Sequence, residues 1–268
     1  MPGHKTRLLI LGGTGEAVAL ARAAIARFGD RLAVISSLAG ATADPVRPPG
    51  EVRIGGFGGA AGLRRFLAEQ GIDLVLDATH PFAATMQANA VEAAAQAGVP
   101  RCRLLRPEWR RQPGDRWIEV DGLAQAAAAL GVLGSRVFLA LGGRDLAAFA
   151  ALPGHWFLVR AVSPPQSPVI NGLFVQARGP FALADERRLL EEHRIDAVVC
   201  RQSGGAGAGA KIDAARALGL PVVMIRRPPA PPPPVVASVE AALEWIAARL
   251  PAWGDIEALA PTGPADAG

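Results

Sequence analysis

The sequence predicts an α/β protein with two lobes, each built on a mainly parallel sheet covered by helices, and a cleft between the lobes. Three observations lead to this fold class. Short apolar runs alternate with helical segments, glycine-rich turns follow several of the runs, and the alternation restarts after residues 122–135. Short apolar runs of this kind are typical of strands buried on both faces of a parallel sheet.

The expected elements alternate along both halves of the chain. In the first half we expect strands at residues 8–11, 32–36, 52–54, 74–78 and 103–105, and helices at 16–27, 60–70 and 83–97. In the second half we expect strands at 137–141, 156–162, 173–177, 197–200 and 222–225, and helices at 145–151, 180–194, 211–218 and 239–250. This order predicts a nucleotide-binding domain at 1–130, a substrate domain at 131–250 and a loose tail at 251–268, with ligands between the domains.

The composition argues against several classes of protein. No apolar run is long enough to cross a bilayer, and the N-terminus does not have the pattern of a signal peptide. Cys102 and Cys200 lie far apart and form no C-x-x-C pair, which argues against a disulfide framework or a zinc site. We therefore expect a cytoplasmic protein without a metal or a membrane partner.

The basic residues indicate a small anionic ligand and no nucleic acid. The net charge is +4, and all but two of the 28 basic residues are arginine. The arginines form small scattered clusters, and aromatic residues suited to base stacking are not interleaved with them. A polyanionic small molecule matches such clusters better than a nucleic acid does.

The first glycine turn, Gly12-Gly13-Thr14-Gly15, joins an apolar strand to a helical segment. A turn of this kind surrounds an anion with backbone N–H groups and the positive end of the helix dipole, so it predicts a phosphate site. The pattern is not G-x-G-x-x-G, because Val18 occupies the third glycine position. Turns of the GGTG kind are common in NADP-using enzymes.

The end of the second expected strand favours NADP as the nucleotide. An NAD site usually has an Asp or Glu here, which binds the ribose 2′-hydroxyl, but this strand ends in Ser36-Ser37 and the next acid is Asp44. Small hydroxyls suit a 2′-phosphate, whereas a carboxylate would repel it. The missing acid also disfavours S-adenosylmethionine, and Arg47 is the only nearby cation that the sequence offers.

Two further turns follow later strands of the first half. The turn at residues 55–59 lies where the pyrophosphate or adenosine of a dinucleotide would cross the strand ends. The segment DATHPF, residues 77–82, allows two interpretations. Thr79 and Pro81 fit a simple helix start, as N-cap and first-turn proline. Alternatively, Thr79 and His80 lie at the end of the strand and face the nicotinamide.

Together, the motifs LLILGGTGEA, RIGGFGG, DATHPFA and ARGPF, with SGG and a later lysine, resemble the precorrin-6A reductase family of cobalamin biosynthesis. The resemblance covers residues 8 to about 250. It implies two Rossmann-like lobes and an oxidoreductase in which NADPH reduces one double bond of the porphyrin-derived macrocycle precorrin-6A, giving precorrin-6B. Relatives in the anaerobic pathway act on the cobalt-bearing substrate, and the sequence leaves this alternative open.

The resemblance and the turns together define two sets of expected site residues. The cofactor-binding set is Gly12, Gly13, Thr14, Gly15, Glu16, Ser36, Ser37, Gly40, Gly56, Phe57, Gly58, Thr79 and His80. The set expected to bind the carboxylates of the tetrapyrrole is Arg144, Arg178, Ser203, Gly204 and Lys211. Lys211 is included because arginine replaces lysine almost everywhere else in the chain. Arg201 departs from the family pattern, and no residue is assigned as the proton donor, for which Asp145, His80, Lys211 and water are candidates.

Three other classes of protein fit the sequence less well. A short-chain dehydrogenase would share the glycine turn, but its acid–base pair needs a tyrosine, and the chain has none. A non-catalytic NADP-binding sensor would not need a second lobe with its own glycine–lysine loop. A methyltransferase is disfavoured by the missing acid after the second strand. The sequence does not determine the oligomeric state, and a monomer is compatible with it.

Overall fold

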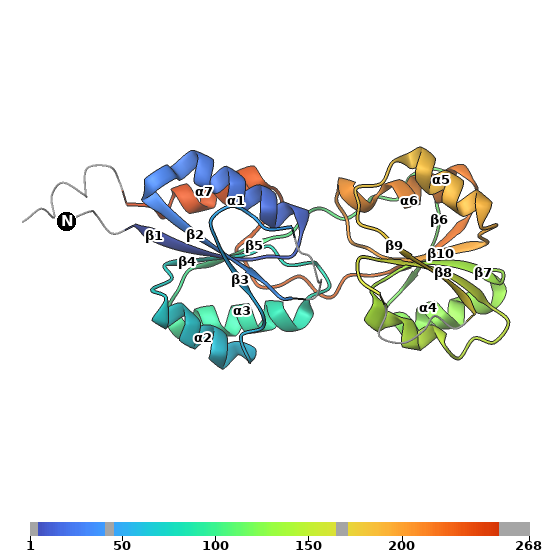
Figure 1. Ribbon diagram of the computed structural model, residues 1–268, viewed down its shortest axis with the longest axis horizontal. Helices are drawn as coiled ribbons and strands as arrows, with labels where there is room; N and C mark the ends of the chain where they lie inside the picture. Colours follow the sequence, from blue (N-terminus) through green and yellow to red (C-terminus); the bar gives the residue numbers. More distant parts are fainter. Residues whose placement is uncertain (1–4, 41–45, 165–170, 252–268) are drawn as a thin grey trace, which may run out of the picture. The chain divides into compact units, whose positions relative to one another are not determined.

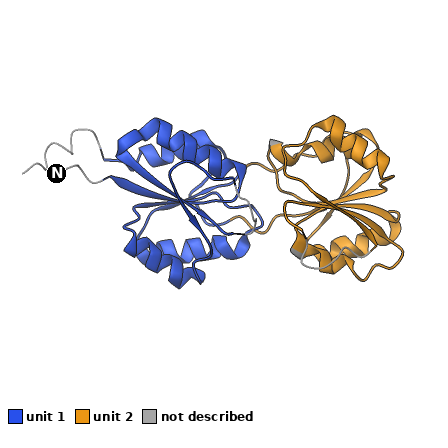
Figure 2. Cartoon of the chain, viewed as in Figure 1, with its two compact units in different colours: residues 1–105, 231–268 blue, residues 106–230 orange. Residues whose placement is uncertain are grey.

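The computed structural model describes residues 5–40, 46–164 and 171–251, which belong to two compact units (Figure 2). Unit 1 comprises residues 1–105 and 231–268, and unit 2 comprises residues 106–230. Each unit contains one six-stranded sheet, and every strand pair described in both sheets is parallel. The predicted α/β class with parallel sheets is therefore confirmed.

The sheet of unit 1 has the strand order β12-β5-β4-β1-β2-β3. Its strands are β1 (Thr6–Leu11), β2 (Leu32–Leu38), β3 (Glu51–Ile54), β4 (Leu74–Asp77), β5 (Arg101–Leu104) and β12 (Val235–Val236). The order reverses between β1 and β4, which lie side by side at the centre of the sheet. In parallel sheets of this order, ligands bind outside the carboxyl ends of the strands at this reversal.

Helices cover both faces of the unit 1 sheet (Figure 1). They are α1 (Gly15–Phe28) and α7 (Val239–Ala247) on one face, and α2 (Gly59–Glu69) and α3 (Ala84–Ala97) on the other, with a 3-10 turn, η1 (Gly29–Arg31), after α1. Because successive side chains of a strand point to opposite faces, Leu8 and Ile10 join the core under α1 and α7, while Leu9 and Leu11 join the core under α2 and α3. This two-sided burial explains why β1 reads as a continuous apolar run.

The sheet of unit 2 has the order β6-β11-β10-β7-β8-β9 and reverses between β7 and β10. Its strands are β6 (Arg116–Val120), β7 (Arg136–Ala140), β8 (Trp156–Ala161), β9 (Gly172–Gln176), β10 (Ala197–Arg201) and β11 (Pro221–Ile225). Its helices are α5 (Leu183–Glu192) and α6 (Ala210–Ala217) on one face and α4 (Leu123–Ala129) on the other, with 3-10 turns η2 (Leu130–Val132), η3 (Gly143–Phe149) and η4 (Ala206–Ala208) (Figure 1).

The unit boundaries differ from the expected division at residue 130. Strand β6 pairs with β11, so residues 106–130 belong to unit 2. After unit 2 the chain returns to unit 1, where β12 pairs with β5 and α7 packs against α1. The sequence does not predict the edge strands β6 and β12. Strand β12 has only two residues, and β6 comes before β7 in the sequence although it lies beside β11 in the sheet. Apart from Pro251, the expected loose tail at 251–268 lies outside the described residues.

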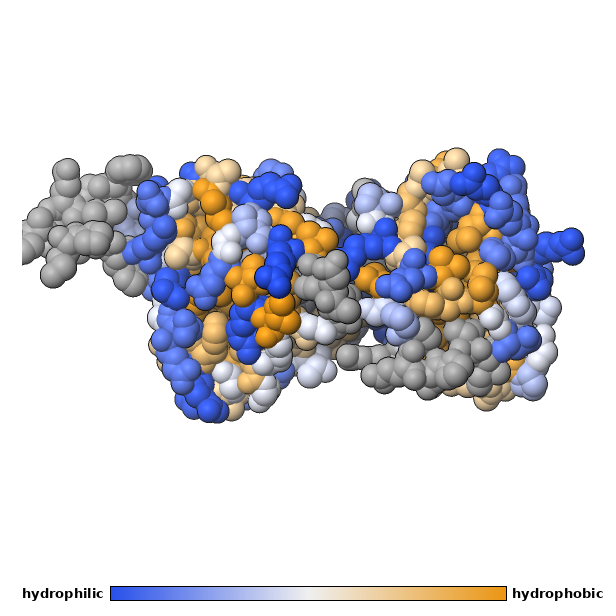
Figure 3. Space-filling model, viewed as in Figure 1, coloured by the Kyte–Doolittle hydropathy of each residue, from blue (hydrophilic) through white to orange (hydrophobic). Residues whose placement is uncertain are grey.

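The described residues also show the character of the surface and the state of the two cysteines. In the described segments, no helix has the length and apolar character that a membrane span requires. The visible face of each unit mixes hydrophilic and hydrophobic residues (Figure 3). Cys102 and Cys200 are both buried as free thiols.

Candidate functional site

The predicted cofactor residues follow four neighbouring strands of unit 1. The turn at residues 12–16 follows β1, Ser36 and Ser37 end β2 with Gly40 close behind, residues 56–58 follow β3, and Thr79 and His80 follow β4. Since the strands are parallel, all of these segments lie at the same edge of one sheet. The structure therefore brings this predicted set together.

The first glycine turn is held tightly against the end of β2. The Gly12 N–H donates to the carbonyl oxygen of Ser37 at 2.9 Å. A Cβ at Gly12 would lie 3.3 Å from Leu38 Cδ2 and 3.4 Å from that same carbonyl, and Gly13 has a φ of +104°. Both positions therefore favour glycine, one for close packing and the other for its backbone conformation.

Thr14 connects this turn to the one that follows β4. Its Oγ1 caps α1 by accepting a hydrogen bond from the Ala17 N–H at 3.2 Å, and it donates to the carbonyl oxygen of Ala78 at 2.7 Å. Helix α1 therefore begins directly after β1, and its first turn, which includes Glu16, lies at the edge where the sheet order reverses. A helix N-terminus in this position fits the pyrophosphate of a dinucleotide.

Arg53 is a cation beside Ser37 that the sequence analysis missed. It pairs in register with Ser37 across β2 and β3, and its Nη1 lies 3.5 Å from Ser37 Oγ. Its guanidinium donates to the carbonyl oxygens of Gly55 and Gly56 and lies over the Phe57 ring, 4.0 Å from the centroid. Ser36 and Ser37 are only 1 % and 6 % exposed, so the half-buried Arg53 is the more accessible polar side chain at this strand end.

Thr79 does not cap the following helix, because α3 begins later and its N-cap is Ala83. Instead, Thr79 Oγ1 donates to Asp77 Oδ1 at 2.8 Å and accepts from Arg103 Nη1 at 2.9 Å. Arg103 also donates to Asp77 Oδ1 at 2.5 Å and to the Thr79 carbonyl oxygen at 2.8 Å. The side chains of Arg103 and Asp77 are both fully buried. The interpretation of this segment as a simple capped helix start was therefore wrong for Thr79.

The carbonyl groups of the same turn are bound from a second side. Gln87 Nε2 donates to the carbonyl oxygens of His80 and Pro81, at 3.1 Å each. The His80 Nδ1 accepts from the Phe82 N–H at 3.3 Å, so the neutral imidazole carries its proton on Nε2. Side chains from α1, β5 and α3 thus hold the turn that presents His80.

In unit 2, an ion pair joins the two strands between which the sheet order reverses. Arg201, at the end of β10, lies 2.8 Å from Asp145, which follows β7, and the two side chains are 29 % and 13 % exposed. Arg178 follows β9 and is exposed. Arg144 lies in η3, but its side chain is outside the described part of the structure.

The loop of Ser203 and Gly204 is fixed by the segment that connects β5 to β6. The Ser203 carbonyl oxygen accepts from Arg106 Nε at 2.7 Å and from Arg227 Nη2 at 2.8 Å. Gly204 has a φ of +66°, and a Cβ there would lie 2.1 Å from the Pro107 carbonyl oxygen. Only glycine fits this conformation and this contact.

Lys211 lies in α6 and is buried, with 6 % exposure. Its Nζ donates to the Ala208 carbonyl oxygen and lies 4.8 Å from the centroid of the Trp109 ring. Burial lowers the pKa of Lys211, and the positive charges of Arg160 and Arg106 lower it further, while Cys200 and Glu186 oppose them. The structure therefore gives Lys211 a desolvated site instead of a solvated surface position.

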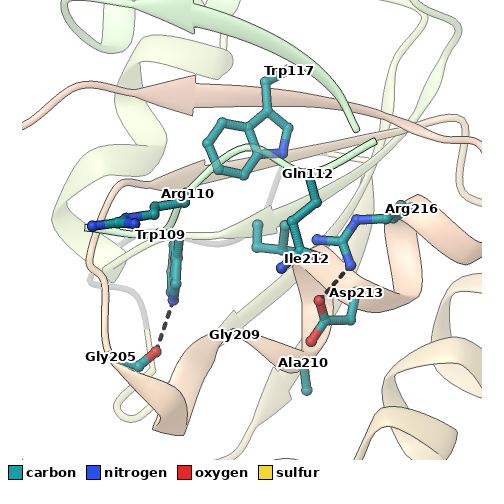
Figure 4. A pocket seen from close by; sticks show the side chains of 10 residues that line it. All are labelled: Trp109, Arg110, Gln112, Trp117, Gly205, Gly209, Ala210, Ile212, Asp213 and Arg216. Atoms are coloured by element: carbon teal, nitrogen blue, oxygen red, sulfur yellow. Dashed lines mark hydrogen bonds and ion pairs between the residues drawn. The ribbon is translucent and has the colours of Figure 1, made fainter. Parts of the chain in front are cut away.

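A cavity of about 350 Å³ lies beside Trp109 (Figure 4). Trp117 closes one side of it, and Gly205, Gly209 and Ala210 form the opposite side. Over the described residues, no group of three or more His, Cys, Asp or Glu side chains is arranged to hold a metal ion.

Arg53 and Arg103 are the site residues that sequence analysis missed. Arg53 lies two residues before the second glycine turn, and a comparison of strand ends after pairing β2 with β3 would have found it. Arg103 stands with Arg101 in a strand that is buried along its whole length, and charges in such a strand are the available signal of buried ionic contacts.

Both units have a parallel sheet whose strand order reverses near its centre, and unit 1 also has the glycine turn of dinucleotide-binding folds. The protein is therefore of the class with two Rossmann-like units. The family model of the precorrin-6x reductases CbiJ/CobK matches residues 7–247, and the chain belongs to this family of oxidoreductases.

Individual relatives agree with the family. A precorrin-6A reductase of Rhodococcus erythropolis is 51 % identical, covering 90 % of this chain and 97 % of the relative. One from Rhodobacter capsulatus is 48 % identical, covering 90 % and 96 %. A cobalt-precorrin-6A reductase of Priestia megaterium is 28 % identical, covering 87 % and 95 %. A solved structure of CobK precorrin-6A reductase is 47 % identical, with a TM-score of 0.85, covering 91 % of this chain and 96 % of that one.

Proposed function

We propose that this chain catalyses the NADPH-dependent reduction of precorrin-6A to precorrin-6B in cobalamin biosynthesis. The family membership supports the reaction, and the arrangement of turns at one edge of the unit 1 sheet supports the use of a dinucleotide. The relatives named as precorrin-6A reductases match nearly the full length of the chain, which favours an enzyme over a non-catalytic sensor.

The contact between Arg53 and Ser37 is the observation that supports NADPH over NADH as the cofactor. A 2′-phosphate at the end of β2 would lie near a fixed guanidinium and a hydroxyl, and no carboxylate ends this strand. The Arg53 guanidinium is already oriented by two carbonyl groups and by the Phe57 ring, so little side-chain entropy would be lost on binding.

The remaining predicted residues keep the following roles in the proposal. Residues 12–16 hold the pyrophosphate, Gly40 and residues 56–58 border the adenosine half, and Thr79 and His80 face the nicotinamide. Bound NADPH supplies the hydride for the reduction. Asp77 and Arg103 hold Thr79 and thereby the orientation of His80.

In unit 2, we assign the carboxylates of the macrocycle to the carboxyl ends of the strands. Arg144, Arg178 and the loop of Ser203 and Gly204 belong to this edge, together with Arg201. Lys211 supports the loop that follows Gly204, because its Nζ donates to the Ala208 carbonyl oxygen and contacts the Trp109 ring. The buried free thiols are compatible with a reducing cytoplasm as the location of the enzyme.

Sequence identity favours the cobalt-free substrate. The relatives named precorrin-6A reductase are 45–51 % identical to this chain, while the cobalt-precorrin-6A reductase of Priestia megaterium is 28 % identical. We therefore propose precorrin-6A as the natural substrate.

The experiment is an anaerobic incubation of the protein with precorrin-6A and NADPH deuterated at the transferred position. Mass spectrometry should find a product that has gained one deuterium and one solvent hydrogen. A parallel incubation with cobalt-precorrin-6A should be much slower. Recovery of unchanged precorrin-6A beside active cobalt-precorrin-6A reduction would assign the enzyme to the other substrate.

A further inference from the structure

The cavity of unit 2 lies between strand β6, the N-terminal turn of α6 and the segment that connects β5 to β6 (Figure 4). Its volume of about 350 Å³ is within the range of pockets that take small organic groups. The lining combines two indole rings with polar groups, so both the shape and the hydrogen-bonding capacity restrict the ligand.

Trp117 provides a buried donor without an acceptor. Its side chain is 7 % exposed, and no acceptor for its Nε1 is found among the described residues. The indole nitrogen lies on the side of the ring nearer to Gln112, which also lines the cavity (Figure 4). Buried indole N–H groups usually have a partner, so this one points to a ligand with an acceptor atom.

Trp109 provides a flat wall that is fixed in place. Its Nε1 donates to the Gly205 carbonyl oxygen at 2.7 Å. Gln202 binds both the N–H and the carbonyl group of the Trp109 backbone, at 3.1 Å each. An indole held in this way offers its face to a planar conjugated ring at little entropic cost.

The charges around the cavity tolerate an anionic ligand. Asp213 is the acid of the lining, and Arg216 binds it at 2.8 Å while also binding Asp115. Arg110 is exposed and is available at the surface of the cavity. The N-terminal turn of α6, which begins at Ala210, adds the positive end of its dipole.

We infer that this cavity binds one pyrrole-derived ring of the substrate together with a carboxylate arm. The inference rests on the proposed function, and it adds a subsite to the carboxyl-edge residues already assigned. The ring stacks on Trp109, and an oxygen of the arm accepts from Trp117 Nε1. A macrocycle of four such rings is too large for this volume, so the other rings remain outside. Trp109 contacts Lys211 and Gly205, which places the subsite directly beside the loop of Ser203 and Gly204.

The first test titrates the full chain with opsopyrrole dicarboxylate, a pyrrole with one acetate and one propionate arm. Nitrogen-labelled protein reports each indole N–H separately, and the sequence contains five tryptophans. The signals of Trp109 and Trp117 should shift, and the Trp117 signal should move downfield as its N–H gains an acceptor. Glutarate, which has two carboxylates but no ring, should produce no such shift. Unmoved signals, or equal shifts with glutarate, would overturn the inference.

The second test uses matched variants. Trp117→Phe keeps an aromatic ring, though a smaller one, and removes the N–H. Trp245→Phe makes the same change at a buried indole N–H that likewise lacks an acceptor in the described part of unit 1. Trp117→Phe should weaken binding of the pyrrole and raise the KM for precorrin-6A about tenfold, while Trp245→Phe changes neither. Ala210→Leu fills the cavity without removing a donor and should abolish pyrrole binding. If Trp117→Phe and Ala210→Leu both bind the pyrrole as well as Trp245→Phe does, the subsite does not exist.

The two proposals fail separately. Pyrrole binding at Trp109 and Trp117 without reduction of precorrin-6A would contradict the proposed function and leave a pyrrole-binding cavity. Reduction of precorrin-6A with no pyrrole bound at these residues would contradict only the subsite.

Discussion

Thr14 and Ala78 connect the two loops that border the strand-order reversal of unit 1, through a 2.7 Å hydrogen bond from Thr14 Oγ1 to the Ala78 carbonyl oxygen. Thr14 Oγ1 also caps α1 by accepting from the Ala17 N–H at 3.2 Å. One hydroxyl thus contacts both the start of the helix and the turn after β4, in addition to the backbone bond from the Ala78 N–H to the Leu11 carbonyl oxygen. Thr14 therefore connects the pyrophosphate and nicotinamide halves of the proposed cofactor site.

Replacing Thr14 by valine should reduce both stability and cofactor affinity. The change removes the N-cap and the bond to Ala78, and we expect the free energy of unfolding to fall by about 1–2 kcal/mol. The KM for NADPH should rise, whereas Thr14→Ser retains the hydroxyl and should stay close to wild type. Urea unfolding and steady-state kinetics measure the two effects. An unchanged KM in Thr14→Val would show that the link between the loops does not shape the cofactor site.

Replacing Arg53 by leucine should remove the preference for NADPH. Loss of a charge-assisted contact to the 2′-phosphate should raise the KM for NADPH about 10- to 100-fold and leave the KM for NADH nearly unchanged. Arg47→Leu serves as the control, because Arg47 is the exposed cation that the sequence suggested for the same role. If Arg47→Leu loses the preference and Arg53→Leu keeps it, the phosphate contact belongs to Arg47.

Arg103→Lys should impair hydride transfer more than it impairs folding. A lysine keeps the charge near Asp77 but cannot bind Thr79 Oγ1, the Thr79 carbonyl group and Asp77 with a planar fork. We expect kcat to fall at least about tenfold, with a larger deuterium isotope effect, and stability to fall by about 2 kcal/mol.

Arg101→Lys is the matched control for this prediction. Arg101 lies in the same strand and is buried, and its Nη2 donates to the Pro232 carbonyl oxygen at 2.8 Å. Among the described residues, this guanidinium has no hydrogen bond to the turn of Thr79. It should lose stability and keep the kcat and isotope effect of the wild type. If both variants lower kcat equally, Arg103 has only a structural role and does not orient the turn of Thr79.

Lys211→Met should change how stability depends on pH. Burial lowers the pKa of Lys211 from its ordinary value of 10.5, so at low pH the folded protein holds a desolvated ammonium. As pH rises toward that value, the unfolded chain keeps this proton while the folded chain releases it, and the wild type gains stability. Methionine removes this gain, so the stability of the wild type relative to the variant should increase as the pH rises toward the ordinary pKa of lysine.

The pH range of this experiment is limited by Cys200. Burial raises the pKa of its thiol from 9.0 to about 11, and the folded state then keeps a proton that the unfolded state loses, so stability falls with pH above the lower value. Urea unfolding at several pH values below this range isolates Lys211. Lys5→Met, at the chain's other lysine, is exposed and should show no pH-dependent difference. A constant gap between wild type and Lys211→Met would contradict a lowered pKa.

The parallel sheets and the glycine turns could be predicted because each depends on local sequence. Leu8 to Leu11 are buried on both faces, which produces the unbroken apolar run, and Gly12 and Gly13 are required by close packing and by backbone conformation. Such signals are visible without knowing which strands are neighbours.

Other features depend on contacts between distant residues and could not be predicted in this way. The unit boundary depends on β6 pairing with β11 and β12 pairing with β5, and each pair brings together segments about a hundred or more residues apart. The proposed role of Arg53 depends on its position beside Ser37 on the neighbouring strand. The role of Thr79 depends on its hydrogen bond with Arg103 on β5. The hydroxyl of Thr79 looks like a helix cap in the sequence because capping is the usual role of a threonine before such a segment.

The most direct test of the proposed reductase is the oxidation of NADPH, followed at about 340 nm, with and without precorrin-6A and with NADH in parallel. We expect oxidation only when the macrocycle is present, with a strong preference for NADPH that Arg53→Leu abolishes. NADPH binding without oxidation by either precorrin-6A or its cobalt form would contradict the reductase and leave a nucleotide-binding sensor.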